Sequence, residues 1–208
     1  MRKKRPLSLV RIVDDDAGVR DSYRFLIESD GWLVKTFSDA EDFLQNDDSE
    51  VPGCAVLDVR MPGKSGLELQ EYLRNLSCSL PVIFISAHAN IEMVVRAMQN
   101  GALDFLPKPV DDAKLLAAVE KAVGISLQQK ESDSQLEALR AKWDSLSDRE
   151  KETARWVGKG MINKLIADRM QITERTVQVH RANVYQKLGV KNAVDLAKVL
   201  MKLKEDKL

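Results

Sequence analysis

The chain has 208 residues, its 32 Lys and Arg balance 32 Asp and Glu, and 44% of its residues are hydrophobic. This composition is typical of a globular protein with one large or two small domains, and no apolar run approaches the roughly 20 residues of a membrane span. The basic start at residues 1–5 does not resemble a signal peptide, and the two cysteines do not suggest a disulfide framework. A cytoplasmic protein with reduced thiols is therefore expected.

The two parts of the chain differ in charge. Residues 1–123 carry 15 Lys and Arg against 20 Asp and Glu, a net charge of −5, whereas residues 124–208 carry 17 against 12, a net charge of +5. Such a split suggests an acidic module joined to one that meets a polyanion. A charge of this size is also that of an ordinary surface, so the asymmetry alone is weak evidence.

The first 120 residues alternate short apolar runs with helical patterns. Each run is followed by apolar residues three and four positions apart, which is the spacing of one helix face. Five such βα units with short connections predict a parallel sheet covered on both faces, in the flavodoxin-like doubly wound arrangement. The predicted strands are Leu9–Val13, Trp32–Phe37, Cys54–Leu57, Val82–Ile85 and Leu103–Leu106.

The rest of the chain divides into a polar stretch and a helical domain. Residues 124–142 are interpreted as a linker that is able to form a helix, between a first domain at 1–123 and a small all-α domain at 143–208. Ser147-Asp-Arg-Glu150 fits a capping box at the start of a helix. Asn163–Met170, a turn, and a helix capped by Thr173 that runs to Leu188 then predict a helix-turn-helix inside a four-helix unit.

Polar side chains follow the predicted strands at the edge where sites gather in an open α/β sheet. Asp14 and Asp15 follow the first strand, Asp58 the third, Ser86 the fourth, and Lys108 comes shortly after the fifth. Crowded carboxylates repel each other unless a cation lies among them, and an oxygen-only ligand set suits Mg²⁺. A metal beside a Lys and a free carboxylate is an arrangement for phosphoryl transfer, with Asp58 as the best nucleophile.

Four motifs follow one another over residues 7–123: Ile12-Val-Asp-Asp15, Leu57-Asp-Val-Arg-Met-Pro-Gly63, Val82-Ile-Phe-Ile-Ser-Ala87 and Asp104-Phe-Leu-Pro-Lys-Pro109. Together they resemble the receiver domains of response regulators. The resemblance implies that a sensor histidine kinase phosphorylates Asp58, and that Asp14 and Asp15 hold Mg²⁺ with Asp58 and the backbone carbonyl of Arg60.

The same resemblance assigns a switch next to the phosphorylated residue. Ser86 is expected to form a hydrogen bond with the phosphoryl group. Lys108 is expected to pair with that group, and the Lys108–Pro109 peptide bond that follows is expected to be cis. Phe105 is expected to turn inward once Ser86 has moved. Phe105 also fits a plain core residue. Asp16 is predicted to be a solvated helix-start residue stabilised by the helix dipole, and His88 to be an exposed loop residue.

Four motifs characterise residues 143–203: Leu146-Ser-Asp-Arg-Glu150, Gly160-Met-Ile-Asn-Lys-Leu-Ile-Ala167, Thr176-Val-Gln-Val-His-Arg181 and Lys187-Leu-Gly189. Together they resemble a LuxR-type helix-turn-helix, so the whole chain resembles the NarL/FixJ class and is closer to the FixJ side. The resemblance implies that the helix after Thr173 enters the major groove of double-stranded DNA. On this resemblance, Gln178, Val179 and Ala182 would face base edges. Arg181 and Asn183 would face the duplex, and Lys164 and Lys187 would lie nearer to phosphates.

Coupling between the two domains is expected to run through dimerisation. A lone helix-turn-helix covers few base pairs, so phosphorylation is expected to create a two-fold face on the helix at 91–100. Its candidate apolar patch is Met93, Val94, Ala97 and Met98. Some of these residues also fit packing on the sheet. Proteins of this class are expected to activate transcription, so RNA polymerase is a further candidate partner. No association with a membrane is expected.

Two other functions compete with this interpretation. An Asp-nucleophile phosphatase needs a second carboxylate two residues after the nucleophile, where this chain has Arg60. We therefore expect a phosphoryl acceptor with at most slow self-dephosphorylation, not an enzyme. The second alternative is a DNA-binding regulator whose receiver senses a partner without phosphorylation. Degenerate receivers of that kind lose a carboxylate or the lysine, and this chain retains both.

Overall fold

The computed structural model describes residue 5 and residues 7–87 and 90–204. The basic residues 1–4 and His88 lie outside the described residues. The chain forms two compact units, Met1–Lys130 and Glu131–Leu208. Each unit has its own hydrophobic core and is described by itself.

The first unit contains a five-stranded parallel sheet in the order β2-β1-β3-β4-β5. This is the predicted flavodoxin-like arrangement. Burial follows from position in the sheet, because β3 and β4 lie inside it and are buried at every residue, whereas the edge strand β2 alternates between exposed and covered positions. The strands are β1 (Leu9–Val13), β2 (Leu33–Phe37), β3 (Gly53–Asp58), β4 (Val82–Ser86) and β5 (Asp104–Pro107).

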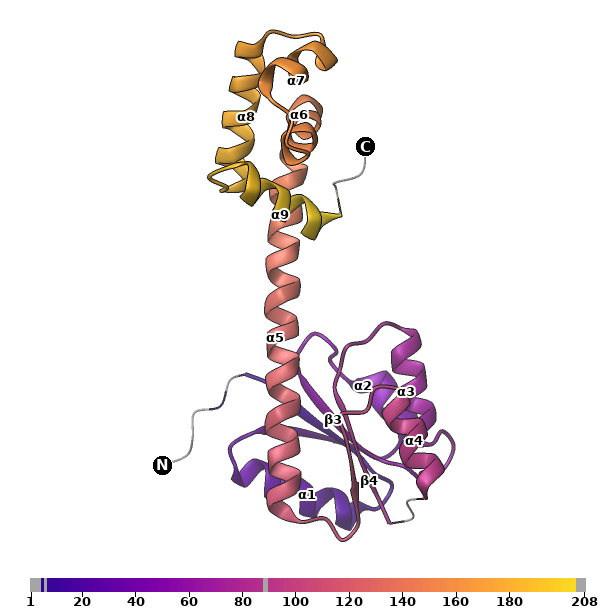
Figure 1. Cartoon of the computed structure of the whole chain (residues 1–208). Helices are drawn as coiled ribbons and strands as arrows, with labels where there is room; N and C mark the ends of the chain where they lie inside the picture. Colours follow the sequence, from indigo (N-terminus) through magenta and orange to yellow (C-terminus); the bar gives the residue numbers. More distant parts are fainter. Residues whose placement is uncertain (1–4, 6, 88–89, 205–208) are drawn as a thin grey trace. The chain divides into compact units, whose positions relative to one another are not determined.

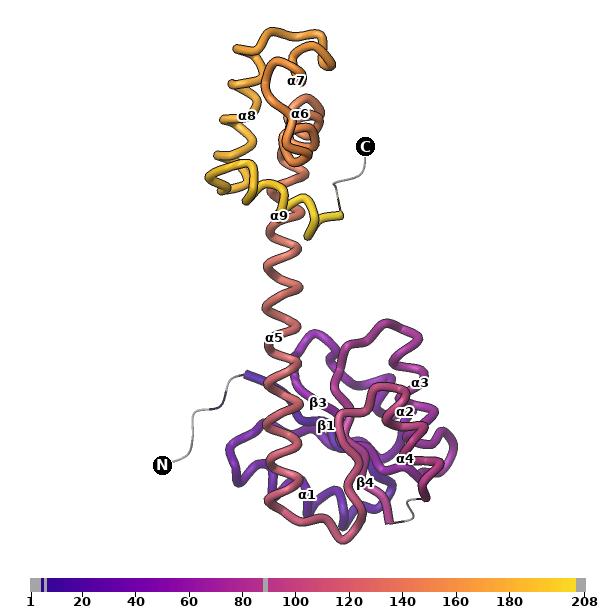
Figure 2. Tube along the Cα trace, viewed as in Figure 1, coloured from indigo at the N-terminus to yellow at the C-terminus, as the bar shows by residue number. Residues whose placement is uncertain are grey.

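Helices cover both faces of this sheet (Figure 1). One core cluster joins the sheet to α2, α3 and α4, and the other joins it to α1 and the first part of α5. The trace in Figure 2 shows the same two layers around the strands. The helices are α1 (Ala17–Ser29), α2 (Ala40–Asn46), α3 (Gly66–Asn75), α4 (Ile91–Gln99) and α5 (Asp112–Asp144).

Side-chain caps start the helices of this unit at the edge where the strands end. Asp16 accepts hydrogen bonds from the amides of Gly18 and Val19, which confirms its predicted place at the start of α1. Ser65 forms a capping box with Glu68 at the start of α3. These caps fix the turns that carry the polar residues of the candidate site.

The helix α5 is continuous from Asp112 to Asp144, so the predicted linker at 124–142 is helical. Its polar middle part separates apolar residues that pack in the first core from Trp143, which packs in the second. Within the described ranges, no helix is long and apolar enough to cross a membrane.

The second unit is a small helical domain built around one core. Ser147 and Glu150 form the predicted capping box, and Gln171 adopts a left-handed conformation with φ of 55° between the second and third helices. This short turn gives the predicted helix-turn-helix layout. The helices are α6 (Asp148–Gly158), α7 (Asn163–Met170), α8 (Glu174–Leu188) and α9 (Ala193–Leu203).

Candidate functional site

A lysine and two aspartates meet at the carboxyl ends of the strands. Asp14 follows β1, Asp58 ends β3, and Lys108 follows β5. The Lys108 Nζ atom lies 2.8 Å from Asp14 Oδ2 and 2.7 Å from Asp58 Oδ1. The ammonium group therefore bridges two carboxylates that would repel each other without a cation between them.

Backbone groups orient both carboxylates. The Arg60 amide donates to Asp58 Oδ2 at 2.6 Å, and the Asp16 amide donates to Asp14 Oδ1 at 2.9 Å. The side chain of Arg20, from α1, donates to the Asp14 carbonyl oxygen at 2.5 Å. Each carboxylate thus keeps one oxygen on a backbone donor and directs the other toward Lys108.

The neighbouring strands bring Lys108 into place. Its amide donates to the carbonyl oxygen of Ser86 at 2.8 Å, and the Lys108–Pro109 bond is cis, as predicted. Ser86 itself is 2% exposed at the end of β4. The structure therefore places Ser86, Lys108 and Asp58 on adjacent strands at one edge of the sheet.

Burial sets the electrostatics of this cluster. Asp58 is 7% exposed, and desolvation raises the pKa of its carboxyl group, although the hydrogen bonds from Lys108 and Arg60 oppose this rise. Burial lowers the pKa of Lys108, but its hydrogen bonds to Asp14 and Asp58 outweigh that effect and the net pKa is raised. Lys108 therefore stays charged and compensates the two carboxylates.

The predicted metal ligands are brought together only in part. Asp15 is exposed, whereas Asp14 and Asp58 are buried. Among the residues that the structure describes, no group of three His, Cys, Asp or Glu side chains is arranged to hold a metal ion. The available donors are nevertheless all oxygens, which is the chemistry that fits Mg²⁺.

The aromatic residue assigned to the switch lies beside the core. Phe105 is half-buried on β5, and its ring centroid is 5.9 Å from that of Phe84 on β4. The structure holds one position of this ring, so the inward movement of Phe105 stays a prediction.

The apolar surface of α4 differs from the predicted patch. Ala97 is fully buried against the sheet, so its expected place in an exposed patch is wrong in this structure. Met98 is 47% exposed, and Met93 and Val94 are half-buried. Ile91 and Val95 are 84% and 46% exposed. Ala97 is thus the α4 residue buried against the sheet, and Met93 packs partly against the same core.

The third helix of the second unit presents the predicted reading residues to solvent. Gln178, Val179 and Ala182 are exposed on α8, with Val179 at 53%. Three apolar residues on the opposite side of the helix are all buried. They are Val177, Val184 and Leu188.

The predicted phosphate and duplex residues are partly engaged within the unit. Arg181 donates to Tyr185 Oη at 2.9 Å and to Asn163 Oδ1 at 3.1 Å, which ties α8 to the start of α7. Asn183 is half-buried, and Lys164 is exposed. Arg181 is therefore held in one orientation at the surface of the helix-turn-helix.

Sequence reasoning missed an ion pair inside the second unit. The Lys187 Nζ atom lies 2.8 Å from Glu150 Oε2, and Glu150 is 4% exposed. Burial raises the pKa of Glu150, but hydrogen bonds from Lys187 and Ser147 outweigh it and lower the pKa to about 2. Lys187 is thus a structural partner of the capping box as well as a predicted phosphate contact. No short-range pattern pairs these residues, because they are far apart in the sequence.

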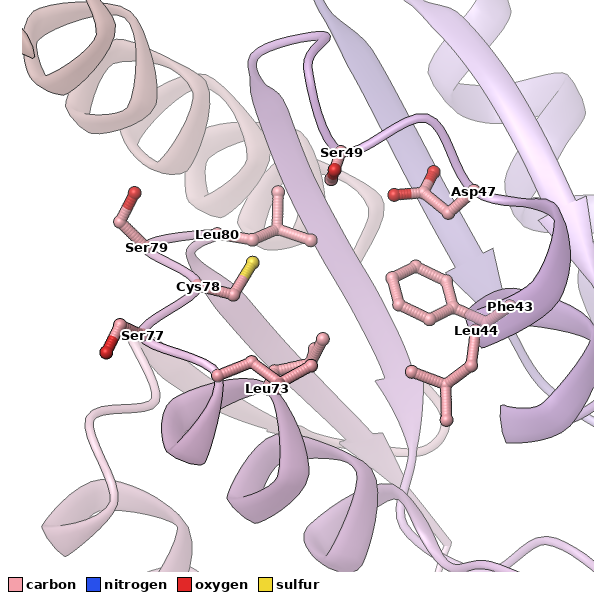
Figure 3. A pocket seen from close by; sticks show the side chains of 10 residues that line it. Phe43, Leu44, Asp47, Ser49, Leu73, Ser77, Cys78, Ser79 and Leu80 are labelled. Carbon is pink, nitrogen blue, oxygen red and sulfur yellow. The ribbon is translucent and has the colours of Figure 1, made fainter.

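A cavity of about 440 Å³ lies at the opposite end of the sheet from Asp58. Figure 3 shows Phe43 and Leu44 of α2 facing Leu73 and Cys78 across it. Its walls come from segments that precede β3 and β4, so it is separate from the lysine–aspartate cluster. Cys78 and Cys54 are both free, as predicted.

Two family models match the chain, one for each unit. The response regulator receiver domain matches residues 10–120, which include the whole lysine–aspartate cluster. The luxR family of bacterial regulatory proteins matches residues 144–200, which include the helix-turn-helix.

Curated relatives and solved structures match nearly the full length. The response regulator protein TmoT of Ectopseudomonas mendocina is 42% identical over 198 residues, covering 95% of this chain and 90% of the relative. The transcriptional regulatory protein FixJ of Bradyrhizobium diazoefficiens is 36% identical over 193 residues, covering 93% of this chain and 94% of the relative. A solved structure of the response regulator StyR is 41% identical with a TM-score of 0.85, covering 95% of this chain and 100% of that chain.

These matches agree with the geometry, because the family models coincide with the two units and the relatives span both. The chain belongs to the two-component response regulators of the NarL/FixJ class, transcriptional regulators that join a receiver domain to a LuxR-type DNA-binding domain.

Proposed function

We propose that Asp58 accepts a phosphoryl group from a sensor histidine kinase, with Mg²⁺, and that phosphorylation promotes receiver dimerisation and sequence-specific DNA binding that activates transcription. The observation that carries this proposal is the bridge from Lys108 to Asp14 and Asp58 at 2.8 and 2.7 Å. This bridge supports the proposal because phosphoryl transfer to a carboxylate needs a cation beside it to balance the charge of the phosphoryl oxygens.

The transfer is a direct displacement at phosphorus. An Asp58 oxygen forms the new bond to phosphorus while the bond from phosphorus to the kinase's histidine nitrogen breaks, and that nitrogen keeps the electron pair. Mg²⁺, held by Asp14, Asp15, Asp58 and the Arg60 carbonyl, would neutralise charge on the phosphoryl oxygens. Lys108 already contacts Asp58 and needs only to follow the new charge to pair with the phosphoryl group.

The switch follows from the new acceptor oxygens. Ser86 ends β4, the strand next to β3, and its hydroxyl would donate to a phosphoryl group on Asp58. When Ser86 moves toward the phosphoryl group, it leaves a space, and the side chain of Phe105 on β5 turns into that space. The face of α4 with Ile91, Val95 and Met98 exposed is then reshaped and associates with its copy.

Dimerisation positions two α8 helices on paired half-sites in DNA. Gln178 can pair with adenine, and Val179 can contact a thymine methyl group. Arg181 and Asn183 orient the helix on the duplex, and Lys164 and Lys187 lie nearer to phosphates. Lys187 has to exchange or share its contact with Glu150 to do so.

The protein acts as a phosphoryl acceptor, not as an enzyme with turnover. Hydrolysis of the acyl phosphate by water returns Asp58 to its free state and ends the signal slowly. The chain lacks the second carboxylate that an Asp-nucleophile phosphatase uses, because Arg60 occupies that position.

Sedimentation velocity with and without acetyl phosphate and Mg²⁺ tests this proposal. Wild type is expected to shift from monomer to dimer and to bind a selected duplex more tightly, whereas Asp58→Asn stays monomeric. The exposed Asp133→Asn serves as the matched control and behaves as wild type. A dimer that forms equally without phosphoryl donor, or in Asp58→Asn, would favour the phosphorylation-independent alternative.

A further inference from the structure

One arginine of the helix-turn-helix is held by side chains from both of its helices. The Arg181 Nη1 atom donates to Asn163 Oδ1 of α7 at 3.1 Å, and its Nε atom donates to Tyr185 Oη, about one turn further along α8, at 2.9 Å. All three side chains are half-buried, and Tyr185 packs against the core of the second unit. We name this set, Asn163, Arg181 and Tyr185, the arginine network.

The network uses only part of the donor capacity of Arg181. A guanidinium group has five N–H donors in one plane, and the bonds to Asn163 and Tyr185 use two of them. One hydrogen on Nη1 and both hydrogens on Nη2 remain. Within the described part of the second unit, no carboxylate lies at ion-pair distance from Arg181. An amide oxygen and a phenol oxygen therefore orient the cation without neutralising it.

Arg181 lies on the flank of α8 and not at the centre of its predicted reading face. From the spacing of residues in a helix, it is roughly 100° around α8 from the middle of the face formed by Gln178, Val179 and Ala182. The bond to Asn163 directs its guanidinium toward the start of α7. In a helix-turn-helix, the first helix crosses the sugar–phosphate backbone while the second lies in the major groove. A cation on this flank is therefore suited to a phosphate and not to a base edge.

We propose that Asn163 and Tyr185 are positioning residues for DNA binding, which hold the free donors of Arg181 against one backbone phosphate of each half-site. A guanidinium that is oriented in advance can make two parallel bonds to phosphate oxygens, and it loses less rotamer freedom than a free side chain. The inference rests on the proposed function, because it requires α8 to lie in the groove of DNA.

Methylphosphonate substitution locates the phosphate. Full-length phosphorylated protein is bound to a duplex selected from a random pool, and single phosphates of that duplex are replaced in turn by uncharged methylphosphonate. Wild type is expected to lose roughly tenfold in affinity at the phosphate that Arg181 contacts, the effect of losing a hydrogen bond to a charged group. Arg181→Ala is expected to bind the unmodified duplex more weakly and to show no further loss at that phosphate.

Asn163→Ala and Tyr185→Phe test the positioning role. Each removes one acceptor and keeps the charge of Arg181, so each is expected to bind the unmodified duplex roughly threefold more weakly. The loss that methylphosphonate causes at the assigned phosphate is expected to shrink in both variants, because the guanidinium is no longer held against it. In an Arg181→Ala background, neither substitution should have a further effect.

Two controls separate positioning from folding. Tyr185→Phe keeps the ring that packs against the core, so its denaturation midpoint is expected to stay near the wild-type value while its phosphate profile changes. Tyr72→Phe, which removes the hydroxyl of an exposed tyrosine on α3, serves as the matched control and leaves the whole phosphate profile unchanged.

Four outcomes overturn the inference or its basis. The same phosphate profile in wild type, Asn163→Ala and Tyr185→Phe would remove the positioning role and leave the proposed function intact. Losses that persist in the Arg181→Ala background would make Asn163 and Tyr185 structural residues only. A change in base preference without a change at any phosphate would assign Arg181 to a base edge. Failure of the phosphorylated wild type to select any duplex would contradict the proposed function itself.

Discussion

At the scale of single residues, two lysines show how one cation serves a structural and a functional partner. Lys108 bridges Asp14 and Asp58, and Lys187 pairs with the buried Glu150. In each pair burial alone would disfavour the charges, and the partner compensates for that cost. Each lysine is also the group expected to meet phosphate. Binding of phosphate would therefore require each lysine to exchange or share its carboxylate partner.

The Glu150–Lys187 pair predicts acid sensitivity of the second unit. The pKa of Glu150 is lowered from 4.5 to about 2, so the pair stabilises the folded state above about pH 4.5 and loses this effect as the pH falls toward about 2. The shift corresponds to at most about 3 kcal/mol, and solvent screening at the 41% exposed Lys187 side chain reduces the contribution below that. Urea unfolding in a Trp32→Phe background, followed by Trp fluorescence, measures it.

The control for this prediction is Glu152→Gln, which removes a more exposed carboxylate from the same helix. Glu150→Gln should flatten the decrease in stability between about pH 4.5 and about pH 2, and Glu152→Gln should preserve it. Parallel curves for wild type and Glu150→Gln would show that this carboxylate does not titrate as proposed.

Reading and positioning residues on α8 are expected to differ in their effect on DNA binding. Gln178→Ala should lower discrimination at one base position by ~1–3 kcal/mol, because its exposed amide faces a base edge. Arg181→Ala should weaken binding to all duplexes, because it removes a charge that Asn163 and Tyr185 hold in place. Affinities across a library of single-base variants measure both effects. Uniform losses for both variants would refute this division.

At the scale of elements, close packing behind Asp58 constrains the start of α3. A Cβ atom added at Gly66 would lie 2.1 Å from the Asp58 carbonyl oxygen and 3.2 Å from Phe84 Cε1. The backbone of β3 cannot yield as a flexible side chain does. The glycine therefore lets α3 begin directly beside Asp58.

Replacing two helical glycines with alanine is expected to change the free energy of unfolding in opposite directions. Gly66→Ala is expected to lower the free energy of unfolding by about 2 kcal/mol through overpacking. Gly124→Ala, at an open position in α5 with nothing within 4 Å, should raise it by about 0.5–1 kcal/mol through helix propensity. Denaturant unfolding of the full chain compares them. Stabilisation by Gly66→Ala would contradict the close approach of α3 to β3.

The sequence predicted elements well where local patterns are strong. Val56 and its neighbours on β3 form a continuous apolar run, which predicted a buried parallel strand, and caps such as Ser147 marked helix starts. It failed on α4, because Ala97 was expected in an exposed apolar patch although it is fully buried against the sheet. Periodicity identifies an apolar face but does not distinguish a core from an interface.

The sequence did not predict the long-range ion pair that Arg11 forms. Arg11 is fully buried on β1, where it pairs with Asp47 at 2.6 Å and donates to the Val51 carbonyl oxygen at 2.9 Å. Its partners lie in the segment before β3, and no spacing rule connects them. The aspartates around Lys108 were predictable, since parallel strands bring their carboxyl ends to one edge.

At the scale of the whole molecule, the chain joins two independently packed units through one continuous helix. Each unit carries its own chemistry, with phosphoryl acceptance expected in the first and DNA recognition in the second. The central claim is that Asp58 receives the phosphoryl group, because the dimerisation and DNA-binding steps depend on it.

Intact mass after incubation with acetyl phosphate and Mg²⁺, beside Asp58→Asn, tests that claim most directly. The account predicts one phosphoryl adduct on the wild type and none on Asp58→Asn. An adduct of equal yield on Asp58→Asn would contradict the assignment of the nucleophile. Absence of any adduct on a wild type that still binds DNA would contradict phosphorylation as the switch.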